Sequence, residues 1–388
     1  MEQLLTACSR LRRSSLRISL LENSISPQIL REFRRQVTQP ADLDFSSEEQ
    51  LAKLFKLLQT WRNPEEKASG LSRFMPIKRT PSASRADLAT LGDYWLATAI
   101  QQDLIQPMEL SRLKGWPSLS ERWRTLVRRD RSGLLTPQGE VWGAPYRWGS
   151  LIMVYRDPPF KSLDWRPTNW SDLWRPELKQ RISLPDHPRL VIGIALQSLG
   201  HSCNETDLGR VPNLADKLAQ LHQEQIKFYS SDTYLQPLIN EDTWLAVGWS
   251  TDILPTIQRY RQLKAVIPEP GSLLTADVWV RPAKIESNGI ESNGEDNADT
   301  AQTPTADLIQ QWLDFCWSPQ VATQLSISSQ GASPIFSETA PSDLPNALQN
   351  NPLLLPKPET FRQSEFLEPF SEAINNKYLT LWTKVRQD

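Results

Sequence analysis

Side chains that could perform catalysis occur in few suitable arrangements in this sequence. Cys203 lies two residues from His201, but a thiol nucleophile and its base normally meet through the fold and not along the chain. Acidic pairs such as Glu241-Asp242 lack the spacing of a general acid and a general base. The sequence also contains no glycine-rich phosphate loop, dinucleotide fingerprint or G-x-S-x-G elbow. An enzymatic function therefore has no positive support.

The composition argues against several other classes of protein. Three cysteines and three histidines favour neither a disulfide framework nor a metal site. A net charge of −2 gives no basic field for nucleic acid. No stretch approaches the roughly 20 apolar residues of a membrane span. We therefore expect no cofactor, no metal and no nucleic-acid partner for this chain of 388 residues.

Fifteen tryptophans are unusual for a chain of this length. The simplest interpretation is that most of them pack in the cores of the protein. A sharper one is that a few form an aromatic box around a ligand, because tryptophan faces attract cations and stack on sugar rings. Both interpretations stay open at this point.

The local patterns alternate between strands and helices and predict an α/β fold. Residues 16–21 favour a first strand, Ser26-Pro27 a helix cap, and Ser46-Ser47 a second cap before the helix 51–61. Later strands are predicted at residues 150–156, 181–184, 226–229, 244–249, 264–268 and 276–281. Residues 284–306, which contain Ile-Glu-Ser-Asn-Gly twice, are predicted to be a disordered surface insertion.

Three stretches carry a resemblance to a known family. They are residues 143–155, with Pro145-Tyr-Arg-Trp-Gly149, then residues 169–179, with Trp170-Ser-Asp-Leu-Trp174 and Pro176-Glu-Leu-Lys179, and finally Ser231-Asp232, Trp249 and residues 274–281. Together they resemble the bacterial periplasmic polyamine-binding proteins, which are the spermidine/putrescine receptors of ABC importers. The tryptophan-rich block is the specific part of the match, and weaker similarity reaches back to residues 18–33.

The resemblance implies a two-lobe periplasmic-binding-protein fold of type II, with a ligand cleft between lobes that are joined by hinge crossings. The expected limits are residues 16–145 plus 274–335 for the first lobe and residues 146–273 plus 336–388 for the second. It also implies a monomeric receptor that binds a small cationic amine of the putrescine or spermidine type and delivers it to an ABC permease in the plasma membrane. Two alternatives are a receptor of the same fold for a sugar, amino acid or other solute, and a sensor or scaffold without transport.

Three residues match the family's ligand-binding positions. Tyr94 matches a binding tyrosine, Trp249 a stacking tryptophan, and Asp277 a central aspartate that grips an ammonium group. A polyamine needs such carboxylates at its amines and aromatic faces along its methylenes. Further candidate acids for the ligand are Asp186, Glu22, Asp93 and Asp232.

The sequence departs from the family pattern at several ligand positions. Leu21 and Thr275 replace aromatic residues, and His187 and Leu190 stand where the family has an acidic pair. With fewer aromatics and acids, we expect a shorter amine or a different solute.

The segment Leu5-Thr6-Ala7-Cys8 has the pattern that the bacterial lipoprotein peptidase cuts, with Cys8 becoming the lipidated first residue. Only seven residues precede Cys8, whereas such a signal normally includes an apolar run of about 7–15 residues. Since the resemblance implies export, we interpret residues 1–15 as a lipoprotein signal remnant and expect a periplasmic, lipid-anchored protein whose gene starts upstream of Met1. An in-frame stop codon just before Met1 would contradict this.

Overall fold

The computed structural model describes residues 14–37, 39–63, 85–111, 113–284 and 304–387. The candidate lipid-attachment residue Cys8 lies outside these ranges. So do residues 285–303 of the predicted insertion, whereas residues 304–306 belong to the first turn of a helix.

The chain alternates strands and helices as expected for an α/β protein. The strands are β1 (Ser14–Leu21), β2 (Ala41–Glu48), β3 (Leu88–Gly92), β4 (Ile105–Gln106), β5 (Arg128–Arg129), β6 (Glu140–Val141), β7 (Ala144–Arg156), β8 (Ile182–Leu184), β9 (Ile226–Tyr229), β10 (Leu245–Trp249), β11 (Leu263–Val266), β12 (Leu273–Pro282) and β13 (Glu365–Phe366). The α-helices are α1 (Pro27–Gln36), α2 (Leu51–Arg62), α3 (Leu96–Gln101), α4 (Glu121–Leu126), α5 (Asp157–Leu163), α6 (Pro188–Ser198), α7 (Leu214–Gln220), α8 (Gln236–Ile239), α9 (Ser250–Arg259), α10 (Pro304–Cys316), α11 (Pro319–Ser329), α12 (Pro358–Gln363) and α13 (Glu372–Gln387).

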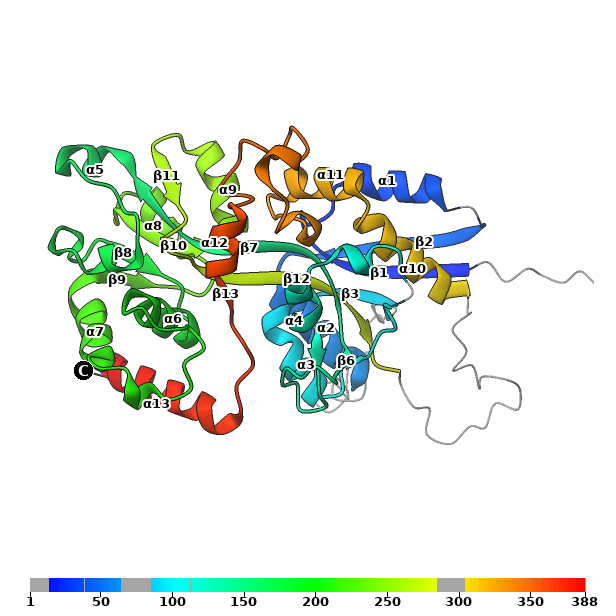
Figure 1. Ribbon diagram of the computed structural model, residues 1–388, viewed down its shortest axis with the longest axis horizontal. Coiled ribbons are helices and arrows are strands. Elements are labelled where there is room, and N and C mark those ends of the chain that lie inside the picture. The colour runs from blue at the N-terminus through cyan, green and yellow to red at the C-terminus, as the bar shows by residue number, and fades with distance from the viewer. Residues whose placement is uncertain (1–13, 38, 64–84, 112, 285–303, 388) are drawn as a thin grey trace, which may run out of the picture.

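Two lobes lie side by side and share their central strands (Figure 1). The strand order β2-β1-β3-β12-β7-β10-β8-β9 runs through both lobes. In the first lobe β1, β2 and β3 are parallel, and β12 runs antiparallel to β3 and β7. In the second lobe β8, β9 and β10 are parallel, and β10 and β11 run antiparallel to β7. The two-lobe α/β fold predicted from the sequence is confirmed.

Long strand β7 links the two lobes because its two halves pair with different partners. Its first half pairs with β12, and its second half pairs with β10 and β11. All 13 of its residues are buried. The local sequence pattern predicted a strand only over residues 150–156, whereas the family resemblance over residues 143–155 implied a strand that crosses between the lobes.

The hydrophobic interior is divided into two main cores. One is formed mainly by side chains from residues 16–148 and 274–366, and the other by side chains from residues 151–273 and 367–385. Leu344, Leu354 and Phe361 belong to the first core, although the sequence analysis placed all of residues 336–388 in the second lobe. We propose that the last crossing between lobes lies at residues 366–367, immediately after β13.

Most of the tryptophans pack in these cores, as the simpler interpretation expected. Trp123, Trp148, Trp279 and Trp312 are at most 1% exposed. Trp123 and Trp148 pack around Phe361, with ring centroids 5.7 and 4.9 Å from it. Burying such large side chains next to the crossing strands stabilises the junction between the lobes, and each contributes about 3–5 kcal/mol against truncation to alanine.

The helix caps were predicted with mixed success. The Ser26 side chain accepts a hydrogen bond from the Ile29 amide at the start of α1, as predicted. The predicted cap at Ser46-Ser47 is wrong, because both serines belong to β2 in its parallel pairing with β1. Helix α2 instead begins after Gln50, whose side chain makes no capping bond.

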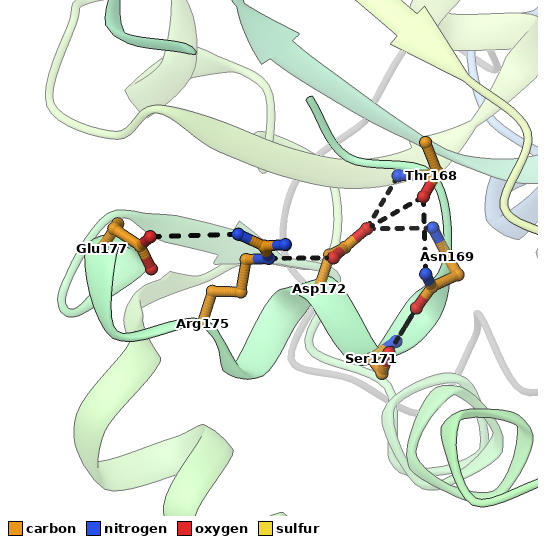
Figure 2. Close-up of polar contacts among 6 residues, drawn as sticks. All are labelled: Thr168, Asn169, Ser171, Asp172, Arg175 and Glu177. Carbon is orange, nitrogen blue, oxygen red and sulfur yellow. Dashed lines mark hydrogen bonds and ion pairs between the residues drawn. The ribbon is translucent and has the colours of Figure 1, made fainter. Parts of the chain in front are cut away.

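The tryptophan-rich block of residues 169–179, which carried the family resemblance, has a structural role in the second lobe. Figure 2 shows Asp172 accepting hydrogen bonds from the amides of Thr168 and Asn169 at 2.8 and 3.1 Å, while Arg175 pairs with its other oxygen. The indole of Trp170 donates to the Gly271 carbonyl, just before β12 begins. The block therefore fixes the strand that returns to the first lobe and does not itself line the cleft.

Candidate functional site

A cavity of about 980 Å³ lies between the two lobes. Its lining comes mainly from segments that follow the carboxyl ends of parallel strands: residues 21–23 after β1, 185–187 after β8, 231–234 after β9 and 249–252 at the end of β10. Residues 49–51 and 327–330, next to α2 and α11, close the first-lobe side. Ligands of open α/β sheets bind at these strand ends, so the inter-lobe cavity is the candidate ligand site.

The floor of the cavity contains a buried ion pair. Arg147 of β7 and Asp277 of β12 are direct neighbours across the two antiparallel strands, next to a register shift that leaves Tyr146 as an extra residue on β7. The Arg147 Nε lies 3.1 Å from the Asp277 Oδ2, and both residues are 7% exposed. The N–H of Nε does not point along a hydrogen bond, so the contact is an ion pair only. Burial raises the pKa of Asp277, and the nearby guanidinium opposes this rise.

A further acid, Asp252, lies beside this pair. The Tyr234 hydroxyl donates to Asp252 in the first turn of α9 and is 3.3 Å from the Trp249 amide. Burial raises the pKa of Asp252, and the hydrogen bond from Tyr234 opposes this rise. Gly248 allows the arrangement, because a Cβ there would lie 2.0 Å from the Tyr234 ring.

Exposed carboxylates surround the mouth of the cavity. Glu22, Asp186 and Asp232 line it with exposed side chains, while Glu49 is paired with Lys53 at 2.6 Å. In all, the described lining contains one arginine, Arg147, and six carboxylates: Glu22, Glu49, Asp186, Asp232, Asp252 and Asp277. This excess of negative charge attracts a cationic ligand and opposes an anionic one.

Aromatic side chains contribute at two places. Trp249 lines the cavity half-buried at the end of β10, where its face can cover methylene groups or a cation. Tyr94, 46% exposed, lines a smaller cavity of about 430 Å³. His187 lines both cavities and meets the Tyr94 ring edge to face, with centroids 5.0 Å apart. Burial lowers the pKa of His187 to about 4, so this contact between the lobes involves a neutral imidazole at neutral pH.

Asp93 lies behind the cavity floor and contacts β12. It is 1% exposed, and its Oδ1 accepts hydrogen bonds from the Ala276 amide at 2.8 Å and from the Thr275 hydroxyl at 3.2 Å. Burial raises the pKa of Asp93 to about 6. These bonds hold the stretch of β12 that leads into Asp277, which makes Asp93 a positioning residue in this structure.

The shifted pKa of Asp93 predicts a distinctive pH dependence of stability. Because the folded state binds the Asp93 proton more tightly than the unfolded chain, Asp93 makes the fold less stable as pH rises from about 4 to about 6. An Asp93→Asn variant keeps the acceptor oxygen and removes the titration. Relative to this variant, the wild type should lose about 2–3 kcal/mol of unfolding free energy as the pH rises from about 4 to about 6.

Urea unfolding of both proteins at about pH 4, 5, 6 and 7 measures this difference. The titration of His187 acts in the opposite direction but occurs in both proteins, so it cancels in the comparison. Parallel stability profiles for wild type and Asp93→Asn would show that Asp93 does not titrate in this range.

The structure thus brings five predicted residues to one cavity, namely Glu22, Asp186, Asp232, Trp249 and Asp277. It places Asp93 and Tyr94 at the neighbouring cavity. The sequence analysis missed Arg147, Tyr234 and Asp252. Arg147 could have been noticed as a charged residue inside the apolar Pro-Tyr-x-Trp-Gly stretch, and Asp252 as an acid just after the strand that ends in Trp249.

The described residues were also compared with the requirements of a membrane-crossing helix and of a metal site. None of the helices in the described ranges is both long and apolar enough to cross a membrane. Within the same ranges, no cluster of three or more His, Cys, Asp or Glu side chains is arranged to hold a metal ion.

Residues 84–364 match the model of a family described as bacterial extracellular solute-binding protein. The chain is 24% identical to the spermidine/putrescine-binding periplasmic protein of Salmonella typhimurium, over 62% of this chain and 68% of that protein. It is 22% identical to the putrescine-binding periplasmic protein of Escherichia coli, over 77% and 78% of the two chains.

Among solved structures, the spermidine/putrescine ABC transporter substrate-binding protein of Streptococcus pneumoniae superposes with a TM-score of 0.73. It is 21% identical, and the match covers 96% of this chain and 99% of that one. This agreement over nearly the whole chain confirms the periplasmic-binding-protein fold. Lipid attachment at Cys8 stays a prediction. The chain belongs to the bacterial extracellular solute-binding proteins, a family of non-catalytic binding proteins.

Proposed function

We propose that the protein binds small organic amines of the putrescine and spermidine class between its lobes and delivers them to its ABC permease. The observation that carries this proposal is the lining of the cleft, where six carboxylates face one arginine. The distant relatives named for putrescine or spermidine binding support the same ligand class.

Each part of the cleft has a role in this proposal. The exposed carboxylates of Asp186 and Asp232 accept hydrogen bonds from an ammonium group. Glu22 approaches from the first lobe, so a bound cation attracts both lobes at once and favours closure of the cleft. Trp249 covers the methylenes that link the charged groups.

Titration calorimetry of the full chain with putrescine and then spermidine tests the proposal. We expect binding that a Trp249→Ala substitution weakens about three- to thirty-fold, because the ring supplies a cation–π or stacking contact. Trp165→Ala is the matched control, since Trp165 is also half-buried but packs under Arg175 and not in the cleft.

The outcomes separate the candidate functions. Amine binding that Trp249→Ala weakens and Trp165→Ala does not would support an amine receptor in this cleft. Absence of binding by the folded protein would contradict it and favour a receptor for a different solute, or a sensor of the same fold. Equal losses in both variants would contradict the assignment of Trp249.

A further inference from the structure

Arg147 presents unused hydrogen-bond donors to the cleft. The residue is 7% exposed and lines the cavity floor. Its Nε lies in the ion pair with Asp277 without donating a hydrogen bond, and neither terminal guanidinium nitrogen donates to any residue in the described part of the chain. The backbone of Gly331 packs closely against the Arg147 side chain, since a Cβ there would lie 2.5 Å from the Arg147 Cγ. The guanidinium is thus fixed between two strands and the end of α11.

A plain polyamine does not suit this end of the cleft. Its protonated nitrogens are hydrogen-bond donors and carry positive charge, and so does the guanidinium. An ammonium group brought to Asp277 would therefore meet a cation that is already paired with that carboxylate. A group that satisfies Arg147 must instead be a hydrogen-bond acceptor, and a carboxylate matches the guanidinium fork in both charge and geometry.

The opposite side of the cleft carries carboxylates and therefore requires a positively charged hydrogen-bond donor. Asp186 follows β8 and Asp232 follows β9, and both side chains are exposed to the cavity. In the sheet, β8 and β9 are the second and third neighbours of β7, with β10 between. The pairings set Asp186 level with Leu151, four residues along β7 from Arg147. At about 4.8 Å per strand and about 3.3 Å per residue, this places the acids roughly 15–18 Å from the Arg147 backbone. The long side chain of Arg147 and the shorter side chains of the two aspartates reduce the gap to the length of a small extended ligand.

We propose that the preferred ligand is an amine that also carries a carboxylate, with its ammonium group between Asp186 and Asp232 and its carboxylate on the free nitrogens of Arg147. This rests on the proposed amine-receptor function, and it makes an amino carboxylate, in place of a plain diamine or polyamine, the preferred ligand. Asp277 then serves chiefly to orient Arg147. Arg147 is the specificity-determining residue of the site.

Pairs of ligands that have equal chain lengths test this directly by calorimetry of the full chain. The pairs are putrescine with 4-aminobutanoate, cadaverine with 5-aminopentanoate, and 1,6-diaminohexane with 6-aminohexanoate. In at least one pair the amino carboxylate should bind about ten-fold or more tightly than the diamine, as expected for a charge-assisted, two-point contact.

Arg147→Met should reverse the preference, because it removes the partner of the carboxylate and leaves Asp277 free for an ammonium group. Arg147→Lys, which keeps the charge but loses the fork, should give an intermediate ratio. Gly331→Ala is a second test of the role of Arg147, since the new methyl group displaces the guanidinium without removing it. It should lower the preference even if Arg147→Met fails to fold.

The results distinguish the two levels of the proposal. Tighter diamine binding by the wild type, or a preference unchanged in both Arg147→Met and Gly331→Ala, would overturn the role of Arg147 and leave an amine receptor standing. If none of these amines nor spermidine binds to the folded wild type, the amine-receptor function itself fails.

Discussion

Asp277→Ala should destabilise the protein by about 3 kcal/mol or more. The substitution leaves the Arg147 guanidinium in the cleft floor without its partner, and removing one member of a buried ion pair typically costs 3–5 kcal/mol. We expect the lower end of this range, because the terminal nitrogens of Arg147 line the cavity and can reach water. Urea unfolding of the ligand-free chain at neutral pH measures the loss.

A second substitution separates the ion pair from simple packing. In the double variant Arg147→Met, Asp277→Leu, no charge remains unpaired, so most of the stability should return. Asp186→Ala is the matched control, since it removes an exposed carboxylate of the same cleft and should change the unfolding free energy by about 0.5 kcal/mol or less. A similar small loss in Asp277→Ala and Asp186→Ala would show that the pair contributes little.

Gly248→Ala should damage both stability and ligand binding. Gly248 belongs to the buried strand β10. The new methyl group at this position would lie 2.0 Å from a ring carbon of Tyr234. Tyr234 must move, and Asp252 then loses the hydroxyl that donates to it. Overpacking of this kind costs about 1–3 kcal/mol, and the loss of the hydrogen bond between the buried Tyr234 hydroxyl and Asp252 adds to it.

Thermal unfolding and amine titration of the same preparations measure the two effects. Amine affinity should fall about ten-fold, because Trp249 follows Gly248 directly and its amide lies beside the Tyr234 hydroxyl. Gly209→Ala is the control, since its Cβ would lie 3.4 Å from the nearest atom, an oxygen of Asp207. Wild-type stability and affinity in Gly248→Ala would contradict the role given to this contact.

Much of the fold could be predicted because its local patterns are strong. The alternation of apolar residues at 16–21 and the Ser26-Pro27 cap indicate their elements without help from tertiary contacts. Strand β2 was missed because Asp42, Asp44, Ser46 and Ser47 look like a loop and a cap, and only their pairing with β1 makes them a strand. The local pattern also missed the first half of β7, which the family resemblance implied.

The site was predicted less completely than the fold. Residues at strand ends, such as Trp249 and Asp186, could be placed from sequence because strand ends converge in this fold. The pairing of Arg147 with Asp277 could not, because 130 positions separate them and their contact depends on the register between β7 and β12. Asp93 was expected at the ligand, but two hydrogen bonds to β12 occupy its Oδ1.

The position of β12 in the sheet has a consequence for how the chain is made. Strand β3 lies between β1 and β12, yet roughly 180 residues, from Gly92 to Leu273, are synthesised between the two strands. At about 5–20 residues per second, the apolar edge of β3 stays without its partner for some ten seconds or more. An open edge of this kind invites pairing with other chains. The first lobe therefore completes its sheet only after most of the second lobe has been synthesised.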